Sequence, residues 1–409
     1  MFVQLRDHVN AFLDLPHAHV PHAESGPLSN LKFGVKDLID VAGYKTGCGN
    51  PNKYQEANIA TSSAPIVQVL LDAGAEFVGK TQTDELAADI LGLRTHLPKA
   101  INSAAPDRMV GGSSSGSAAA VSAGLVGFTL GTDTRGSIRT PASFNGILGL
   151  RTTWGRISNE GLSPMSPRFD TIGWFAKDIE IFEKVSQVIF SSKASQIPVG
   201  LTPPNLDNPT ILRLPDYERF IIELEAREEY DRMLKIVEKT FEQVKFGRYL
   251  AYSPEETCEI GSGLLSYEVW QVYKDWMISK QPILHPEVRQ YLEATSKITV
   301  ESYEANDKRQ AICRADLLDL LGDSNVIVLP SVPSIAPLLF ISEDAINEFC
   351  RPAIILHSIA TVSGCPQITL PIGTVRGAPF GLSLLGPPYS DEALISLGKK
   401  ILQTANISK

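Results

Sequence analysis

Two glycine- and serine-rich clusters, separated by a run of small apolar residues, constrain the fold of this chain more than any other feature. The clusters read Gly-Gly-Ser-Ser-Ser-Gly-Ser over residues 111–117 and Gly-Thr-Asp-Thr-Arg-Gly-Ser over residues 131–137. Such residues have little apolar surface to bury, so they do not form a hydrophobic core. They suit a place where backbone amides and hydroxyls crowd around a ligand. The segment between them predicts a helix over 115–125 and a buried strand over 126–130, which would hold both clusters at one site.

The flanking segments indicate an α/β fold, because predicted helices and strands alternate along them. Apolar periodicity and turn residues predict strands over 31–41, 75–79 and 326–329, a helix over 64–73, and two strands with a final helix after 364. A chain of 409 residues is long enough to form one large unit of this kind.

The section from about 180 to 320 has a different, helical character. Apolar residues recur at helical spacing from Tyr230 to Val244, with acids and lysines between them, and a second charged helix is predicted over 302–321. No clear linker separates this section from the rest. We therefore expect a helical cover over the core within one domain, residues 31–409, which residues 1–30 precede as an N-terminal arm.

The composition argues against several classes of function. The 37 basic and 46 acidic side chains give a formal charge of −9, which disfavours a nucleic-acid-binding surface. The longest apolar run, residues 118–130, contains serine and glycine and is too short to span a membrane. The seven histidines show no metal-ligand spacing, and the five cysteines include no Cys-x-x-Cys pair. Because the first residues also do not resemble a signal peptide, a cytoplasmic protein without a metal is expected.

The serine clusters fit several kinds of site to different degrees. A phosphate-binding loop requires a lysine after its glycines, and residues 111–117 have none. A nucleophile elbow, Gly-x-Ser-x-Gly, is matched at residues 112–116, but that mechanism also needs an acid and a histidine downstream. Only His285 and His357 follow, in contexts typical of structural histidines. A turn that caps a helix explains one cluster but not two. The remaining interpretation uses a lysine as the base.

The chain resembles the amidase signature family over several separate segments. The matching segments are Phe-Gly-Val-Lys-Asp-Leu-Ile-Asp-Val-Ala-Gly at 33–43, the two clusters extended to 111–120 and 131–139, and residues 149–158 and 169–173. The resemblance is dense from about residue 30 to 180 and resumes from about 325 to the end. It implies a single α/β domain with a large mixed central β-sheet covered by helices on both faces. Within the family, the chain most resembles the short indole-3-acetamide hydrolase-like amidases and their uncharacterised bacterial relatives.

The family's motifs imply the catalytic roles by position. They place the nucleophile at Ser137, a proton-relaying serine at Ser113 and the base at Lys36. A serine hydroxyl is a poor nucleophile until a base takes its proton. A lysine can take it only when neutral, so Lys36 is expected where burial and the lack of a carboxylate partner disfavour its charge. The resemblance also implies a cis peptide bond between Gly112 and Ser113.

The other site residues implied by the resemblance stabilise charge or brace the loop. The oxyanion of the tetrahedral intermediate would be held by the backbone N–H groups of Thr134, Arg135, Gly136 and Ser137. The supporting side chains would be Ser114, Ser115, Asp133 and Arg139.

Three positions depart from the family's pattern. Arg135 stands where the family usually has glycine, and two interpretations stay open: it recognises an acidic or polar group of the substrate, or it points to solvent. Asn145 stands where relatives often have cysteine. Residues 89–103 lack the Gly-Glu-Asn-x-x-Tyr-Gly-Thr pattern of the most similar relatives, so indole-acetamide specificity is not transferred to this chain.

The sequence therefore predicts an amidase that hydrolyses the C–N bond of a small carboxamide through an acyl-enzyme, releasing a carboxylate and ammonia or an amine. It would use no cofactor and no metal, and would bind neither nucleic acid nor membrane; a homodimer stays open. Two alternatives remain, the amidase subunit of a tRNA-dependent amidotransferase and a non-catalytic amidase-like docking protein. The presence of Lys36, Ser113 and Ser137 argues against the docking protein.

Overall fold

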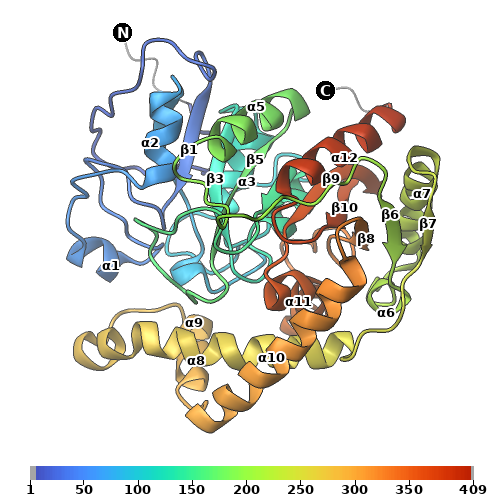
Figure 1. Ribbon diagram of the computed structural model, residues 1–409. Helices are drawn as coiled ribbons and strands as arrows, with labels where there is room; N and C mark the ends of the chain where they lie inside the picture. The colour runs from blue at the N-terminus through green and yellow to red at the C-terminus, as the bar shows by residue number, and fades with distance from the viewer. Residues whose placement is uncertain (1–5, 407–409) are drawn as a thin grey trace.

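Ten short and mostly buried strands form one central β-sheet (Figure 1). The computed structural model describes residues 6–406. Its strands are β1 (Lys32–Lys36), β2 (Glu76–Thr81), β3 (Phe128–Asp133), β4 (Leu148–Arg151), β5 (Thr171–Ala176), β6 (Thr210–Arg213), β7 (Val244–Phe246), β8 (Asn325–Pro330), β9 (Gln367–Val375) and β10 (Ala378–Leu385). They lie in the order β2-β1-β3-β5-β4-β9-β10-β8-β6-β7.

The sheet is mixed, and its parallel part positions the two serine clusters. β1 pairs in parallel with β2 and β3, and β6 pairs in parallel with β7 and β8. The strands between these two groups pair in antiparallel fashion. Because β1 and β3 are parallel neighbours, their carboxyl ends at Lys36 and Asp133 reach the same edge of the sheet.

Helices cover both faces of this sheet. One face carries α2 (Pro65–Asp72), α5 (Ile179–Phe190), α7 (Leu224–Thr240) and α12 (Asp391–Thr404). The other carries α3 (Ser115–Ser122), α4 (Arg139–Asn145) and α11 (Glu343–Ser363). The shortest helical segments are α1 (Pro51–Glu56), α6 (Pro215–Glu218) and the 3-10 turn η1 (Glu85–Ala87). The predicted fold class, a single α/β domain with a large mixed sheet, is confirmed.

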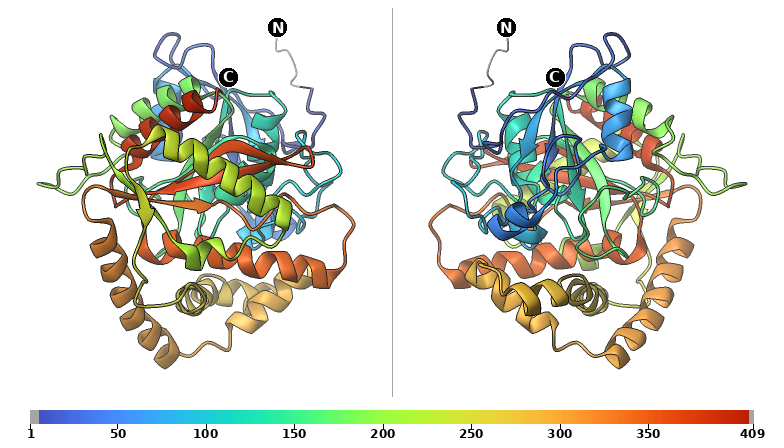
Figure 2. Two further views of the ribbon diagram at one scale, coloured as in Figure 1. Left: turned by 90° about the vertical axis from the view of Figure 1, so that its right-hand side faces the viewer. Right: turned by 90° about the vertical axis from the view of Figure 1, so that its left-hand side faces the viewer.

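Three more helices form an outer layer beyond α11, namely α8 (Pro254–Lys280), α9 (Pro286–Thr295) and α10 (Val300–Leu321). They lie together below the sheet in Figure 1, and Figure 2 shows α11 between them and the body of the molecule. A capping box starts α8, in which Ser253 accepts the Glu256 N–H and the Glu256 carboxylate accepts the Ser253 N–H. This layer corresponds to the helical cover expected from the sequence.

The section between α5 and α8 is less helical than its apolar spacing indicates. The spacing predicts one helix through Val244, but α7 ends at Thr240 and the backbone of Phe241 is extended. Val244 begins β7, which pairs in parallel with β6 at the edge of the sheet. Backbone pairing with a strand far away in sequence therefore overrides the local pattern, and that part of the prediction is wrong.

Residues 6–30, the described part of the expected N-terminal arm, contain little regular structure but contact the body of the protein. Phe12 forms an antiparallel bridge with Thr81 of β2. The Leu13 N–H donates to the Lys80 carbonyl at 2.9 Å, and Leu28 is completely buried. This segment therefore extends the sheet edge beside β2.

Glycine at position 173 allows β5 to lie close to its neighbour β4. Gly173 pairs with Gly131 of β3 on one side, and the next residue, Trp174, pairs with Leu150 of β4 on the other. A Cβ atom on Gly173 would overlap the Leu150 carbonyl oxygen. Any side chain here therefore requires the backbones of two adjacent central strands to move apart.

We expect Gly173→Ala to lower the free energy of unfolding by roughly 1–3 kcal/mol, and with it the midpoint of thermal unfolding. The reason is that the backbone of Leu150 cannot move aside as a side chain would. Gly127→Ala is the matched control, since its Cβ would come no closer than 3.4 Å to the Leu31 side chain. Calorimetric scans of both variants compare the two sites, and equal midpoints would contradict the packing argument.

Candidate active site

The amine of Lys36, at the end of β1, contacts hydroxyl groups from both serine clusters. Its Nζ is hydrogen-bonded to Ser113 Oγ at 2.8 Å, to Ser114 Oγ at 2.9 Å and to Thr132 Oγ1 at 2.9 Å. Ser113 Oγ donates in turn to Ser137 Oγ at 3.0 Å. The structure thus brings together the three residues for which the family resemblance implies catalytic roles. Thr132, which contacts the same amine, was not singled out from the sequence.

Local backbone structure fixes the positions of Ser113 and Ser137. The peptide bond between Gly112 and Ser113 is cis, as the resemblance implied, and Ser113 lies two residues before the start of α3. Glycine is required at 112, because a Cβ there would overlap the Asp84 carboxylate. Ser137 lies in the turn that joins β3 to α4. The end of the loop that leads into α3 and the turn between β3 and α4 therefore present the two hydroxyls to each other.

The environment of Lys36 favours the neutral amine. Its side chain is completely buried, and burial lowers its pKa from 10.5 to about 7, although the carboxylates of Asp84, Asp133 and Asp170 act in the opposite direction. Within residues 6–406 no carboxylate forms an ion pair with its Nζ. A substantial fraction of the Lys36 side chain is therefore deprotonated at neutral pH, which is the condition for a lysine base.

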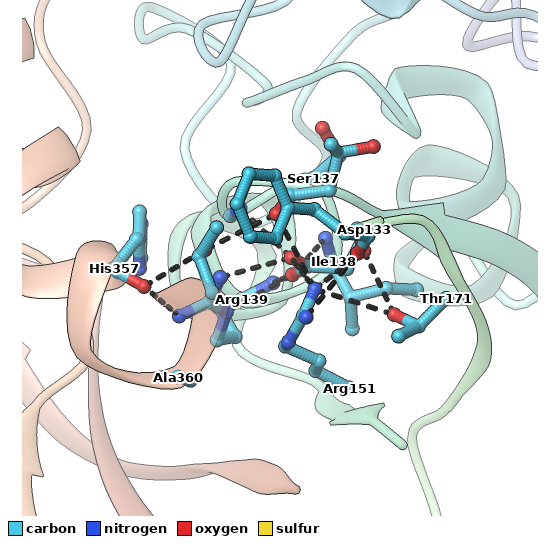
Figure 3. Close-up of polar contacts among 12 residues, drawn as sticks. Asp133, Ser137, Ile138, Arg139, Arg151, Thr171, His357 and Ala360 are labelled. Carbon is cyan, nitrogen blue, oxygen red and sulfur yellow. Dashed lines mark hydrogen bonds and ion pairs between the residues drawn. The ribbon is translucent and has the colours of Figure 1, made fainter. Parts of the chain in front are cut away.

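Asp133 braces the turn that carries Ser137 (Figure 3). Its carboxylate accepts the N–H groups of Gly136 at 2.8 Å and Ile138 at 3.0 Å. It also forms buried ion pairs with Arg139 at 2.9 Å and Arg151 at 3.1 Å. Burial alone would raise the pKa of Asp133, but the two guanidinium groups hold it well below its usual range. The carboxylate therefore stays ionised, and the backbone of the turn is held in place.

Arg139 and His357 connect this turn to α11. Arg139 Nη1 donates to the His357 carbonyl and to Gln367 Oε1, both at 3.0 Å. His357 Nε2 lies 2.7 Å from Thr140 Oγ1, and burial keeps the pKa of the ring well below its usual range. A Cβ atom on Gly136 would overlap this ring, so the turn and α11 touch directly. The histidine is thus a neutral packing residue, which agrees with its structural interpretation from the sequence.

One of the four backbone N–H groups predicted to form the oxyanion hole already has a partner. The Gly136 N–H donates to Asp133 Oδ1, so this group takes part in the brace. The Thr134 side chain is also fixed, because its hydroxyl donates to Asp170 at 2.6 Å. The oxyanion hole stays a prediction, and it then depends chiefly on the N–H groups of Thr134, Arg135 and Ser137.

The remaining predicted positions differ in their contacts. Ser114 binds Lys36 and donates to the Thr132 carbonyl at 3.1 Å, so it supports the amine directly. Ser115 begins α3, and no hydrogen bond of its hydroxyl is found within the described chain, so its supporting role stays a prediction. Asn145 donates to the Val110 carbonyl at 2.6 Å and to the Pro141 carbonyl at 2.8 Å. It therefore ties the segment before the cis peptide to α4.

A cavity of about 220 Å³ opens beside Ser137. Arg135 is half-buried at its wall, and Arg135 Nη1 donates to Ser262 Oγ of α8 at 2.8 Å. The other walls come from the loop around η1 and from helices α8, α9 and α11. They include Ala87, Ala88, Asp89, Ile90, Arg94, Met165, Leu265, Tyr291, Ile346, Asn347, Cys350 and Ile354. These residues could not be singled out from the sequence, because they lie in segments without a recognisable motif.

Among residues 6–406, no group of three or more histidine, cysteine, aspartate or glutamate side chains is arranged to hold a metal ion.

This combination of fold and side chains is matched by a known protein family. The family model described as Amidase matches residues 13–395. The chain therefore belongs to the amidase family, the amidase signature enzymes, which confirms the resemblance seen in the sequence.

Individual relatives cover nearly the whole chain. Amidase 1 of Oryza sativa subsp. japonica is 32% identical over 98% of this chain and 96% of its own length. Outer envelope protein 64, chloroplastic, of Arabidopsis thaliana is 30% identical over 96% of this chain and 70% of its own length. A solved crystal structure of an amidase is 27% identical with a TM-score of 0.80, covering 92% of this chain and 85% of the other. The family thus includes proteins named for amidase activity and a protein named for its place in a chloroplast envelope.

We expect the burial of the Lys36 amine to appear in the pH dependence of stability. Since the pKa falls from 10.5 to about 7 on folding, the unfolded chain binds a proton that the folded protein lacks between these pH values. Stability of the wild type therefore rises with pH in this window, by about 2 kcal/mol between pH 7 and pH 9.

Denaturant unfolding of wild type and Lys36→Met at both pH values measures this rise, because the variant has no amine to titrate. Lys184→Met, on the exposed face of α5, is the control whose difference from wild type stays constant. A wild-type advantage that does not grow with pH would show that the Lys36 pKa is not lowered.

Proposed function

We propose that this chain hydrolyses the C–N bond of a small carboxamide through an acyl-enzyme formed on Ser137. The observation that carries the proposal is the continuous hydrogen-bonded path from the buried Lys36 amine through Ser113 to Ser137. A lysine with a pKa of about 7 is matched to proton transfer at neutral pH. Membership in the amidase family supports the same reaction class.

The reaction follows from this path. Neutral Lys36 takes a proton from Ser113, which takes the proton of Ser137 as the Ser137 oxygen attacks the amide carbonyl. The tetrahedral oxyanion is held by the backbone N–H groups of Thr134, Arg135 and Ser137, and each such donor contributes roughly 3 kcal/mol. As the C–N bond breaks, the proton returns through Ser113 to the leaving nitrogen, which departs as ammonia or an amine. Water then attacks the ester by the same proton path and releases the carboxylate.

The contacts of Asp133 keep the turn that carries Ser137 in a fixed orientation. Electrostatic stabilisation of an oxyanion is effective only if the donors are already oriented before the charge develops. Asp133, Arg139 and Arg151 are completely buried and fix the backbone on both sides of Ser137. We assign them to positioning of the turn, with no direct part in bond formation.

The two alternative functions are less well supported. A docking protein does not require a buried lysine with a lowered pKa or a hydroxyl relay, yet both are present. No contact in the described chain favours an amidotransferase subunit over a free-standing amidase. We therefore retain the amidase as the proposed function, and a homodimer stays a prediction.

The state of the cysteines supports a cytoplasmic location. Within the part of the chain that the structure describes, no helix is long and apolar enough to cross a membrane. All five cysteines are free thiols. Free thiols are usual in a reducing compartment, which supports the cytoplasm.

We expect Ser137→Ala to reduce kcat by about a thousandfold or more, because no other hydroxyl occupies the end of the proton path. Lys36 and Ser113 belong to the same proton path as Ser137. Adding Lys36→Met or Ser113→Ala to Ser137→Ala therefore lowers kcat little further. Ammonia release from a panel of primary amides measures the effect.

Ser396→Ala, on the exposed side of α12, is the control and retains full activity. Retained turnover by folded Ser137→Ala protein would remove Ser137 from the mechanism.

We expect kcat/KM to rise with pH on the acid side, with an apparent pKa near 7, because only the neutral Lys36 amine accepts a proton. Below that pH the rate falls about tenfold per unit. A profile that stays flat from pH 5 to 8 would argue against a lysine base.

A further inference from the structure

Two arginine side chains line the cavity beside Ser137, and they come from different parts of the chain. Arg135 is two residues before the nucleophile, and its Nη1 is held by Ser262 of α8 at 2.8 Å. Arg94 lies in the loop after η1, and its Nη1 donates to the Ala88 carbonyl at 2.7 Å. Neither guanidinium forms an ion pair with a carboxylate anywhere in residues 6–406. Both are oriented by neutral acceptors and retain unused N–H donors.

The acidic side chain in the cavity wall does not form an ion pair with either arginine. Asp89 is the one acidic side chain among the lining residues, and it is mostly buried. Its two oxygens accept the backbone N–H groups of Ile90 and Leu93, both at 2.8 Å. The Asp89 carboxylate is thus committed to its own loop. The lining residues therefore include two guanidinium groups and one carboxylate, and the carboxylate oxygens are already hydrogen-bonded. This gives the cavity wall a surplus of positive charge.

Much of the rest of the wall is apolar, although Thr134, Tyr291 and Asn347 also line it, and the cavity leaves little room. Ile90, Leu265, Ile346 and Ile354 supply aliphatic surface from the loop after η1 and from helices α8 and α11. A cavity of about 220 Å³ is smaller than the roughly 300–1,000 Å³ of pockets that hold drug-sized ligands. A short hydrocarbon chain with a polar group at each end fits such a space, with one end at Ser137.

We infer that the substrate is a small primary carboxamide that also carries a carboxylate, such as the monoamide of a short dicarboxylic acid. The inference deepens the proposed amidase function and rests on it. Arg135 and Arg94 hold the carboxylate, the aliphatic walls pack against the methylene chain, and the amide carbon lies at Ser137 Oγ. Hydrolysis adds one water across the C–N bond, so the products are the dicarboxylate and ammonium ion.

Arginine suits this task for a physical reason. Its planar guanidinium matches a carboxylate with two parallel N–H donors, and it stays charged at every pH at which the enzyme would work. A neutral amide or ester in place of the carboxylate would leave those donors without an anionic partner. The resulting selectivity is a preference for the charged compound over an uncharged one of the same length.

The first experiment measures binding apart from catalysis. Ser137→Ala protein is titrated calorimetrically with malonamate, succinamate and glutaramate, and with the diamide of the same acid in each case. We expect at least one monoamide to bind about tenfold or more tightly than its diamide, and Arg135→Gln in the same background to abolish that difference. Arg94→Gln reduces the difference partly, and Arg135→Lys restores part of it.

A matched control removes an arginine elsewhere. Arg314 is half-buried at a different cavity, between Trp154 and α10, so Arg314→Gln leaves the preference for the monoamide unchanged. Equal binding of all monoamides and their diamides, or a preference that survives Arg135→Gln, would overturn the carboxylate site.

Turnover separates this inference from the proposed function. In the otherwise wild-type enzyme, Arg135→Gln is expected to lower kcat/KM for the preferred monoamide at least about tenfold more than it lowers kcat/KM for the diamide of the same acid. If diamides are hydrolysed with the same kcat/KM as the monoamides, the amidase proposal stands and the carboxylate inference fails. If no amide is hydrolysed, the amidase proposal fails, and the binding titration still decides the carboxylate site.

Discussion

The burial of one unpaired lysine amine is the constraint on which the rest of this structure depends. An ionised amine without a carboxylate partner is costly in a protein interior, and the cost is reduced here by three hydroxyl contacts and by loss of the proton. Those hydroxyls come from Ser113, Ser114 and Thr132, so the amine can be accommodated only if both serine clusters meet at the end of β1. The parallel pairing of β1 with β3, the cis peptide and the small-residue helix α3 together satisfy this requirement.

Asp133 provides the second constraint, since it joins segments that are far apart in sequence. Its ion pairs with Arg139 and Arg151 connect the end of β3 to α4 and β4, and Arg139 extends the network to α11 and β9. Three buried charged groups are expensive unless each is paired and hydrogen-bonded. The network meets that condition and keeps the turn before Ser137 in one conformation. Stability and catalytic geometry therefore depend on the same contacts.

Much of the fold around the site could be predicted from the sequence, because the relevant signals are local. The periodicity of residues 64–73 predicts α2, and the small-residue run after residue 115 predicts α3. The resemblance to the amidase signature family singled out Lys36, Ser113 and Ser137, and the fold brings them within hydrogen-bonding distance. Strand β7 and the cavity wall could not be predicted, because their positions depend on pairing and packing between distant segments. For the same reason the sequence left two interpretations of Arg135 open, while the structure places its side chain at the cavity beside α8.

The arrangement of the outer helices has a consequence for how such a protein can change over time. The proton path lies on turns of the central sheet, whereas much of the cavity wall belongs to α8, α9 and α11. Substitutions on those helices can reshape the space offered to a substrate without touching a single bond of the relay. Arg135 is the exception, because it lies on the catalytic turn and contacts α8 as well. A lineage that altered this residue would have to adjust substrate choice and the nucleophile's own loop in the same step.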